Sequence, residues 1–241
     1  MDSVDYTKRR RIMKARSLPL VAAALFCVIG ASADVLVTID GGAMTNGYMN
    51  VFNLPAPDGD GAYQFSSPWG IADLSATFSG GGITVTMIPN SITDPSDYWY
   101  IGGGAPGNPG NKIMEASLYN EVTGAYAGQT VTFSGNILEN SLTPAHEAVA
   151  FIRDFAPDYS SFTESAIPLS STGLFSIDLA TGNDAGRHVQ YGIQMTGVNV
   201  WATDLEPFGS IVAEAIPEPS SIILLMVAGG GLWGIRRRLV M

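Results

Sequence analysis

The sequence predicts an all-β protein, with a single β-sandwich or jelly-roll domain between two terminal apolar segments. Runs with apolar side chains at every second position recur at 35–39, 83–87, 130–134 and 175–179, the period of strands with one buried face. Loops rich in Gly, Asn, Asp and Pro separate them, as at 55–61 and 102–110. Short alternating runs joined by such loops are typical of sandwiches. A domain of this length, residues 34–215, can bury one core.

The secondary structure of two further segments, 148–155 and 191–201, is ambiguous from the sequence. Residues 148–155 contain Phe151 and Phe155 at a spacing that fits either a helix or a strand, and we predict a strand buried on both faces because the neighbouring runs are β. In 191–201 the apolar phase changes at Thr196-Gly197. We expect a β-bulge or bend at Gly197.

The first 33 residues have the layout of a secretory signal helix. Six cations precede the apolar stretch 18–30, and Ala31-Ser32-Ala33 follows it. This order predicts export, with cleavage by signal peptidase after Ala33. The one cysteine, Cys27, lies in the apolar stretch, so the mature chain is expected to have no disulfide or thiolate chemistry.

The start and the route of export have two interpretations. KRRRIMK at 8–14 resembles a twin-arginine motif, which would imply export of a folded protein. However, a complete signal also begins at Met13. We favour Met13 as the true start and the general secretion machinery as the route.

The C-terminal segment combines a Pro-Glu-Pro triplet, an apolar run and an arginine cluster. The run from Ile222 to Ile235 spans roughly 21 Å as a helix, which is short against a hydrocarbon core of about 30 Å. Arg236, Arg237 and Arg238 would hold its end on the cytoplasmic side. A short apolar helix over 220–235 therefore suits a transient membrane halt better than an anchor.

Pro217, Glu218 and Pro219, the apolar run and the three arginines resemble the PEP-CTERM sorting signal, a tail also described on some ice-binding proteins. The resemblance covers residues 216–238, with Ile216 where the family usually has Val. It implies cutting near Pro217-Glu218 by exosortase, a membrane transpeptidase, then delivery to the cell surface or outer envelope, often with exopolysaccharide. A sorting signal does not specify what its cargo does.

The cargo is strongly acidic. Residues 34–216 hold three basic and 19 acidic side chains, a difference of −16. Such a charge repels phosphate backbones and excludes nucleic acid as a partner. It suits solubility outside the cell or contact with divalent cations.

Signatures of catalysis are mostly missing. His146-Glu147 is not followed by the second histidine of a zinc protease helix, and no Gly-x-Ser-x-Gly elbow occurs. Carboxylates for a glycosidase pair are plentiful, but sequence spacing does not show which of them face each other. We therefore expect no enzyme activity and no required cofactor.

Two weaker signals point to binding. Tyr98, Trp99 and Tyr100 precede a glycine run and could offer rings to a sugar, although burial of alternate rings in the core is the favoured interpretation. Asp58 and Asp60 resemble the start of a calcium loop but lack its further ligands, so an acidic turn is favoured.

The domain also loosely resembles carbohydrate-binding jelly rolls. We expect an exported, non-enzymatic surface or matrix protein with a structural or polysaccharide-associated role. The alternative is a secreted polysaccharide-active enzyme. A facing carboxylate pair in a cleft would favour the enzyme, and exposed aromatic side chains would favour binding.

Overall fold

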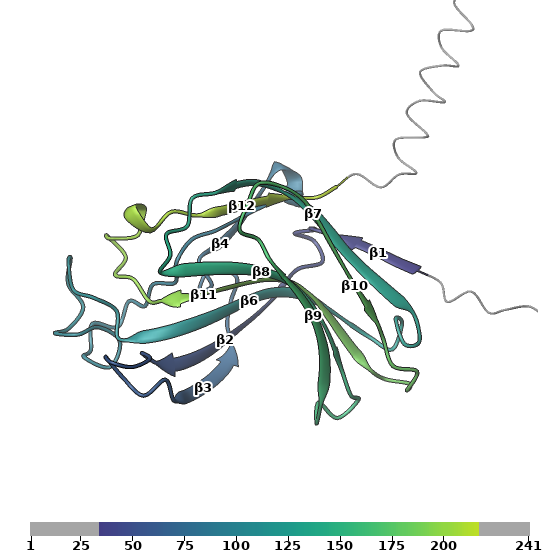
Figure 1. Cartoon of the computed structure of the whole chain (residues 1–241), viewed down its shortest axis with the longest axis horizontal. Coiled ribbons are helices and arrows are strands. Elements are labelled where there is room, and N and C mark those ends of the chain that lie inside the picture. Colours follow the sequence, from purple (N-terminus) through teal and green to yellow (C-terminus); the bar gives the residue numbers. More distant parts are fainter. Residues whose placement is uncertain (1–33, 217–241) are drawn as a thin grey trace, which may run out of the picture. The chain divides into compact units, whose positions relative to one another are not determined.

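The computed structural model describes residues 34–216, which form two six-stranded β-sheets (Figure 1). Within these residues the helical content is limited to two short 3₁₀ turns, η1 (Gly80–Gly82) and η2 (Glu206–Phe208). None of the described helices is long and apolar enough to cross a membrane. The all-β, two-sheet prediction is confirmed.

Sheet A is built around its longest strand, β7. Its strands are β1 (Asp34–Thr38), β7 (Thr130–Asn140), β12 (Ile211–Glu214), β5 (Thr84–Met87) and β4 (Ala76–Ser79) in that order, with β10 (Gly173–Ala180) also pairing with β7. β1 runs parallel to β7, and the other pairs are antiparallel.

Sheet B is a continuous antiparallel sheet. Its order is β3 (Tyr63–Pro68), β2 (Asn46–Asn53), β6 (Lys112–Thr123), β11 (His188–Val198), β8 (His146–Phe155) and β9 (Phe162–Pro168). β6 and β11 are its central strands, and they pair over eleven residues without a register shift.

The core lies between the two sheets. Successive side chains of a strand point to opposite faces, so β6 sends Met114, Ala116 and Leu118 inward. Phe133 of sheet A bridges the layers, with its ring 5.4 Å from that of Tyr191 in sheet B. Burying one such side chain contributes about 1.5–3 kcal/mol to stability. The inner faces of the two sheets share one buried core, which is the arrangement of a β-sandwich.

The predicted strands are present, and residues 148–155 belong to β8, with Ala150, Phe151 and Ile152 all buried. The bulge at Gly197 is wrong, since β11 keeps one register through that residue on both sides. The apolar phase changes there because β11 is buried on both faces. A Cβ on Gly197 would lie 2.1 Å from Cδ2 of His146, so the imidazole occupies that space.

The processing signals lie outside the described residues. This applies to the signal segment 1–33 with Ala31 and Ala33. It applies equally to the sorting residues Pro217, Glu218, Pro219, Arg236, Arg237 and Arg238, and to the short apolar helix expected at 220–235. Their interpretation remains a prediction.

Candidate functional site

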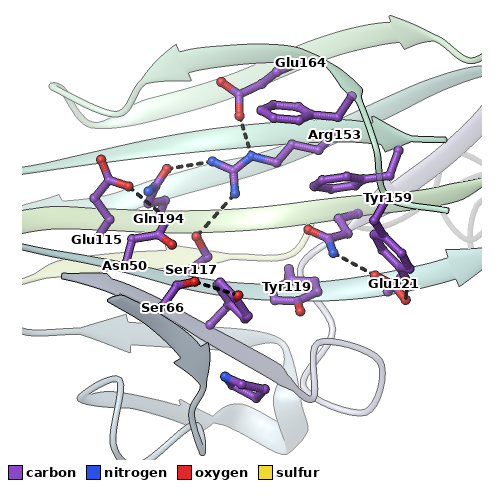
Figure 2. Close-up of a pocket in the computed structure, with 15 residues that line it drawn as sticks. Asn50, Ser66, Glu115, Ser117, Tyr119, Glu121, Arg153, Tyr159, Glu164 and Gln194 are labelled. Carbon is purple, nitrogen blue, oxygen red and sulfur yellow. Dashed lines mark hydrogen bonds and ion pairs between the residues drawn. The ribbon is translucent and has the colours of Figure 1, made fainter. Parts of the chain in front are cut away.

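A groove of about 810 Å³ crosses the face of sheet B that points away from the core. We call it the sheet B groove (Figure 2). It is lined by side chains from all six strands and the β8–β9 hairpin: Tyr48, Asn50, Ser66, Pro68, Glu115, Ser117, Tyr119, Glu121, Arg153, Phe155, Tyr159, Phe162, Glu164, Gln190 and Gln194.

Strand alternation and register explain how these residues meet. The odd-numbered residues of β6 from Glu115 to Glu121 all point to the groove because their even-numbered neighbours fill the core. Cross-strand pairing then aligns Glu121, Gln190, Arg153 and Glu164 in one row over β6, β11, β8 and β9. The site is therefore a product of sheet topology.

Arg153 holds the centre of the groove. Its Nε donates to Glu164, its Nη2 donates to Oε1 of Gln194 at 2.9 Å, and its Nη1 lies 3.4 Å from Oγ of Ser117. The guanidinium also lies 4.1 Å from the centre of the Phe151 ring, within cation–π range. Figure 2 shows these bonds radiating from one side chain.

The floor of the groove is polar and buried. Ser117, Gln190 and Gln194 are at most 8% exposed, although the outer face of an antiparallel sheet is usually solvated. Each of these side chains has a hydrogen-bond partner, since Ser117 and Gln194 contact Arg153 and Gln190 donates to Glu121. The floor is therefore a set of hydrogen-bonded polar groups that faces the groove.

Gly192 is the residue of β11 that pairs with Tyr119 on β6 and Phe151 on β8. A Cβ at Gly192 would lie 2.0 Å from the carbonyl oxygen of Leu118, so the backbone of β6 leaves no room for a side chain there. Of the two flanking rings, Tyr119 lines the groove, and Phe151 is buried beside Arg153.

The β8–β9 hairpin closes one end of the groove with aromatic rings. Tyr159, at its tip, donates a 2.9 Å hydrogen bond to Oε1 of Glu121, and its ring stacks on His188 at 4.1 Å. Phe155 lies between Tyr159 and Phe162, at 5.6 and 5.0 Å. Tyr159 has φ of 57°, a strained value for a residue with a side chain.

The opposite end is polar. Nδ2 of Asn50 donates to Oε2 of Glu115 at 3.1 Å, and the hydroxyls of Tyr48 and Ser66 lie 2.9 Å apart. Pro68 separates this end from a second hollow of about 390 Å³ that contains Trp69. A ligand along the groove would thus pass from rings to hydrogen-bonding groups.

Burial affects the groove tyrosines. Burial raises the pKa of Tyr159 to about 12, and the hydrogen bond to Glu121 adds to this rise. Burial, followed by the charge of Glu121, also raises the pKa of Tyr119. Both phenols therefore stay neutral and able to donate hydrogen bonds at physiological pH.

The aromatic residues singled out in the sequence lie elsewhere. Tyr100 is fully buried and its hydroxyl donates to the carbonyl of Ile92 at 2.8 Å, while Trp99 packs against the core. Tyr98 is 40% exposed, with the Lys112 ammonium 4.3 Å from its ring centre. The two adjacent rings of Trp99 and Tyr100 thus turn inward, Trp99 only in part, while Tyr98 faces solvent, so these three residues form no three-ring platform.

Asp58 and Asp60 belong to a turn. Oδ1 of Asp60 accepts from Nδ2 of Asn53 at 2.8 Å and from the amide of Ala62 at 2.9 Å. These bonds, led by that from Asn53, lower the pKa of Asp60. Among residues 34–216, no three His, Cys, Asp or Glu side chains gather as metal ligands. Calcium binding at this turn remains a hypothesis, and the described residues supply no set of ligands for it.

Sequence reasoning did not find the groove residues. The alternation in KIMEASLYNEVT at 112–123 was a usable signal, since its outward positions carry two glutamates and a tyrosine. Bringing Arg153 and Glu164 beside them required the strand order.

No protein-family model and no curated protein matches this sequence. Among solved structures, the enzymatically active domain of tailspike protein 4 of bacteriophage CBA120 is similar at a TM-score of 0.28 and 13% identity. That match covers 59% of this chain and 19% of the other chain. Similarity at this level supports no functional conclusion.

Proposed function

We propose that the chain is a non-catalytic polysaccharide-binding protein of the cell surface or extracellular matrix, and that the sheet B groove is its binding site. The observation that carries this proposal is a long groove with a buried polar floor and aromatic walls on an otherwise ordinary outer sheet face. Hydrogen-bonding groups and aromatic faces together are what recognise a sugar's hydroxyls and its apolar C–H face.

The groove offers groups for both kinds of contact. The Arg153 guanidinium has five N–H donors, of which three have partners among the described residues. The hydroxyls of Tyr48 and Ser66 lie at the polar end, and the rings of Tyr159 and Phe162 are about half exposed at the other end.

The second candidate is a polysaccharide-active enzyme, because Glu121 and Glu164 share one cross-strand row. Two strands separate them, so their Cα atoms are roughly 14 Å apart at ~4.8 Å per strand. Gln190 and Arg153 stand between them in that row, where the scissile bond of a catalytic pair would lie. We therefore favour binding without catalysis.

Export and sorting complete the proposal. Signal peptidase would cut after Ala33, and exosortase would remove the tail near Pro217-Glu218 after a transient membrane halt. The cargo would then reach the outer surface, where polysaccharide is available. This part rests on the sequence patterns at 1–33 and 216–241.

A glycan array probed with the full chain tests the binding function. We expect retention of one or more polysaccharides by the wild-type chain and by Tyr98→Ala, the control for an exposed ring outside the groove. Tyr119→Ala should lose retention while its melting temperature stays close to the wild-type value.

The array also separates the alternatives. Retention lost only in Tyr98→Ala would place binding at the loop instead of the groove. Release of new reducing ends from a retained glycan, abolished by Glu121→Gln, would establish the enzyme. No retention of any glycan would contradict both candidates.

A further inference from the structure

The charges of the groove are unbalanced. Three glutamates line it, Glu115, Glu121 and Glu164, against one arginine. The Arg153 charge is committed to Glu164. Residues 34–216 contain two other cations besides Arg153, and neither of them lines the groove.

Those two cations are also engaged. Arg187 pairs with Asp154 at 2.8 Å and with Asp184 at 3.2 Å. The Lys112 ammonium donates to the carbonyl of Asn111 at 3.1 Å and lies against the Tyr98 ring. No positive side chain of the described domain is thus placed to offset Glu115 or Glu121.

Glu115 and Glu121 have neutral partners and unused acceptor capacity. Glu115 accepts one bond from Asn50, and its Oε1 has no partner among residues 34–216. Glu121 accepts from Tyr159 and from Nε2 of Gln190 at 2.7 Å, which leaves two of its roughly four acceptor sites. His188 Nδ1 lies 3.7 Å from Glu121 and adds charge only when protonated.

The two carboxylates are spaced along the path of a ligand. Both belong to β6 and face the groove, six residues apart, which is about 20 Å at ~3.3 Å per residue. Tyr119 lies between them, and its ring can also attract a cation. The groove therefore presents separate anionic points along its length instead of one compact metal-binding cluster.

Resting on the proposed function, we propose that the polysaccharide bound in the sheet B groove carries ammonium groups, as a de-N-acetylated amino-sugar polymer does. Each ammonium donates three hydrogen bonds and matches a carboxylate that lacks a cation. A polyuronate or sulfated glycan would instead place like charges against Glu115 and Glu121, which disfavours binding.

Calorimetric titration of the full chain tests this inference. The probes are a glucosamine hexasaccharide, its fully N-acetylated counterpart and an oligogalacturonate. We expect the amine-bearing hexasaccharide to bind at least ten-fold more tightly than the acetylated one. Its affinity should fall with added salt, and the oligogalacturonate should not bind.

Matched charge variants separate the groove from the acidic surface as a whole. Glu115→Gln and Glu121→Gln should each weaken binding of the amine-bearing hexasaccharide several-fold, and by more than they weaken binding of the acetylated one, so that the preference for the amine-bearing glycan decreases. Glu139→Gln removes the same charge from an exposed position on β7 in sheet A and should change neither affinity.

Equal affinity for the two hexasaccharides would overturn the inference and leave polysaccharide binding standing. The same loss in Glu139→Gln as in the groove variants would also overturn it, because general surface charge would then explain the preference. Failure of every glycan to bind would contradict the proposed function itself.

Discussion

The phenol of Tyr159 donates a 2.9 Å hydrogen bond to the carboxylate of Glu121, joining the β8–β9 hairpin to the central strand β6 across 38 residues of sequence. The contact closes the aromatic end of the groove. Because Tyr159 adopts φ of 57°, the hairpin accepts backbone strain to hold this ring over the groove, which points to a role in binding.

Replacing Tyr159 by glycine should therefore separate binding from stability. Glycine relieves a backbone strain of about 1 kcal/mol or more, which offsets the lost ring contact and hydrogen bond. We expect a free energy of unfolding within about 1 kcal/mol of wild type, together with loss of glycan retention. Denaturant unfolding and the glycan array measure the two effects. A large loss of stability would instead make Tyr159 a structural residue.

Removing Arg153 should cost more than removing its ionic partner. Arg153→Ala leaves the buried amide of Gln194 without its donor, a penalty of about 1–3 kcal/mol. Glu164→Gln breaks an ion pair whose glutamate side chain is 35% exposed, worth at most about 1 kcal/mol. Urea denaturation of both variants checks this order. Equal costs would mean that the floor network does not depend on the guanidinium.

Stability should decline in mild acid because of His146. Its Nε2 lies 2.8 Å from the carbonyl oxygen of Val198 and so carries the proton, while its buried Nδ1 has no partner within residues 34–216. Burial lowers the pKa of His146 below 6.5. Below pH 6.5 the imidazole of His146 is therefore protonated more readily in the unfolded chain than in the folded one. The contribution of His146 to the free energy of unfolding is full above pH 6.5 and falls as the pH drops below it.

Melting temperatures between pH 7 and pH 5 measure this effect, and His146→Gln should flatten the slope. The carboxyls of Asp60 and Asp158, whose pKa values are lowered by hydrogen bonds, contribute stability that is lost only as the pH falls below 3.8. An unchanged slope in His146→Gln would contradict the assignment.

The sorting hypothesis predicts that the mature surface protein lacks residues 222–241. The backbone amide of Ile216 donates to Oγ1 of Thr38 at 3.1 Å, so a cut after this residue leaves β12 and its contacts intact. Intact-mass measurement of the surface protein checks the prediction, and replacing Arg236, Arg237 and Arg238 together by Ala should make precursor accumulate. A wild-type mass that includes Met241 would show that the tail is an anchor.

The sequence predicts the fold class because alternation depends on local spacing. The alternating runs at 35–39 and 130–134 were recognisable for that reason, and they pair as β1 and β7. The alternation in β6 is harder to recognise, because its outward face carries the aromatic residue Tyr119 as well as polar residues. The difference in polarity from the inward Met114 and Leu118 is therefore smaller.

The groove depends on long-range pairing, which sequence spacing does not reveal. Arg153 and Ser117 are 36 residues apart, and Asn50 and Glu115 are 65 apart. The aromatic triplet at 98–100 is the more conspicuous signal in the sequence, but Tyr100 is buried, with its hydroxyl donating to the carbonyl of Ile92.

Amide chemical shifts of the full chain, recorded during titration with an amine-bearing hexasaccharide, show whether the sheet B groove is the binding site. We expect saturable shifts that cluster on the groove, at Tyr119, Gly192, Arg153 and Tyr159, with sheet A unaffected. Shifts confined to sheet A or to residues 98–100, or no shifts with this or any other oligosaccharide, would rule out binding in the groove.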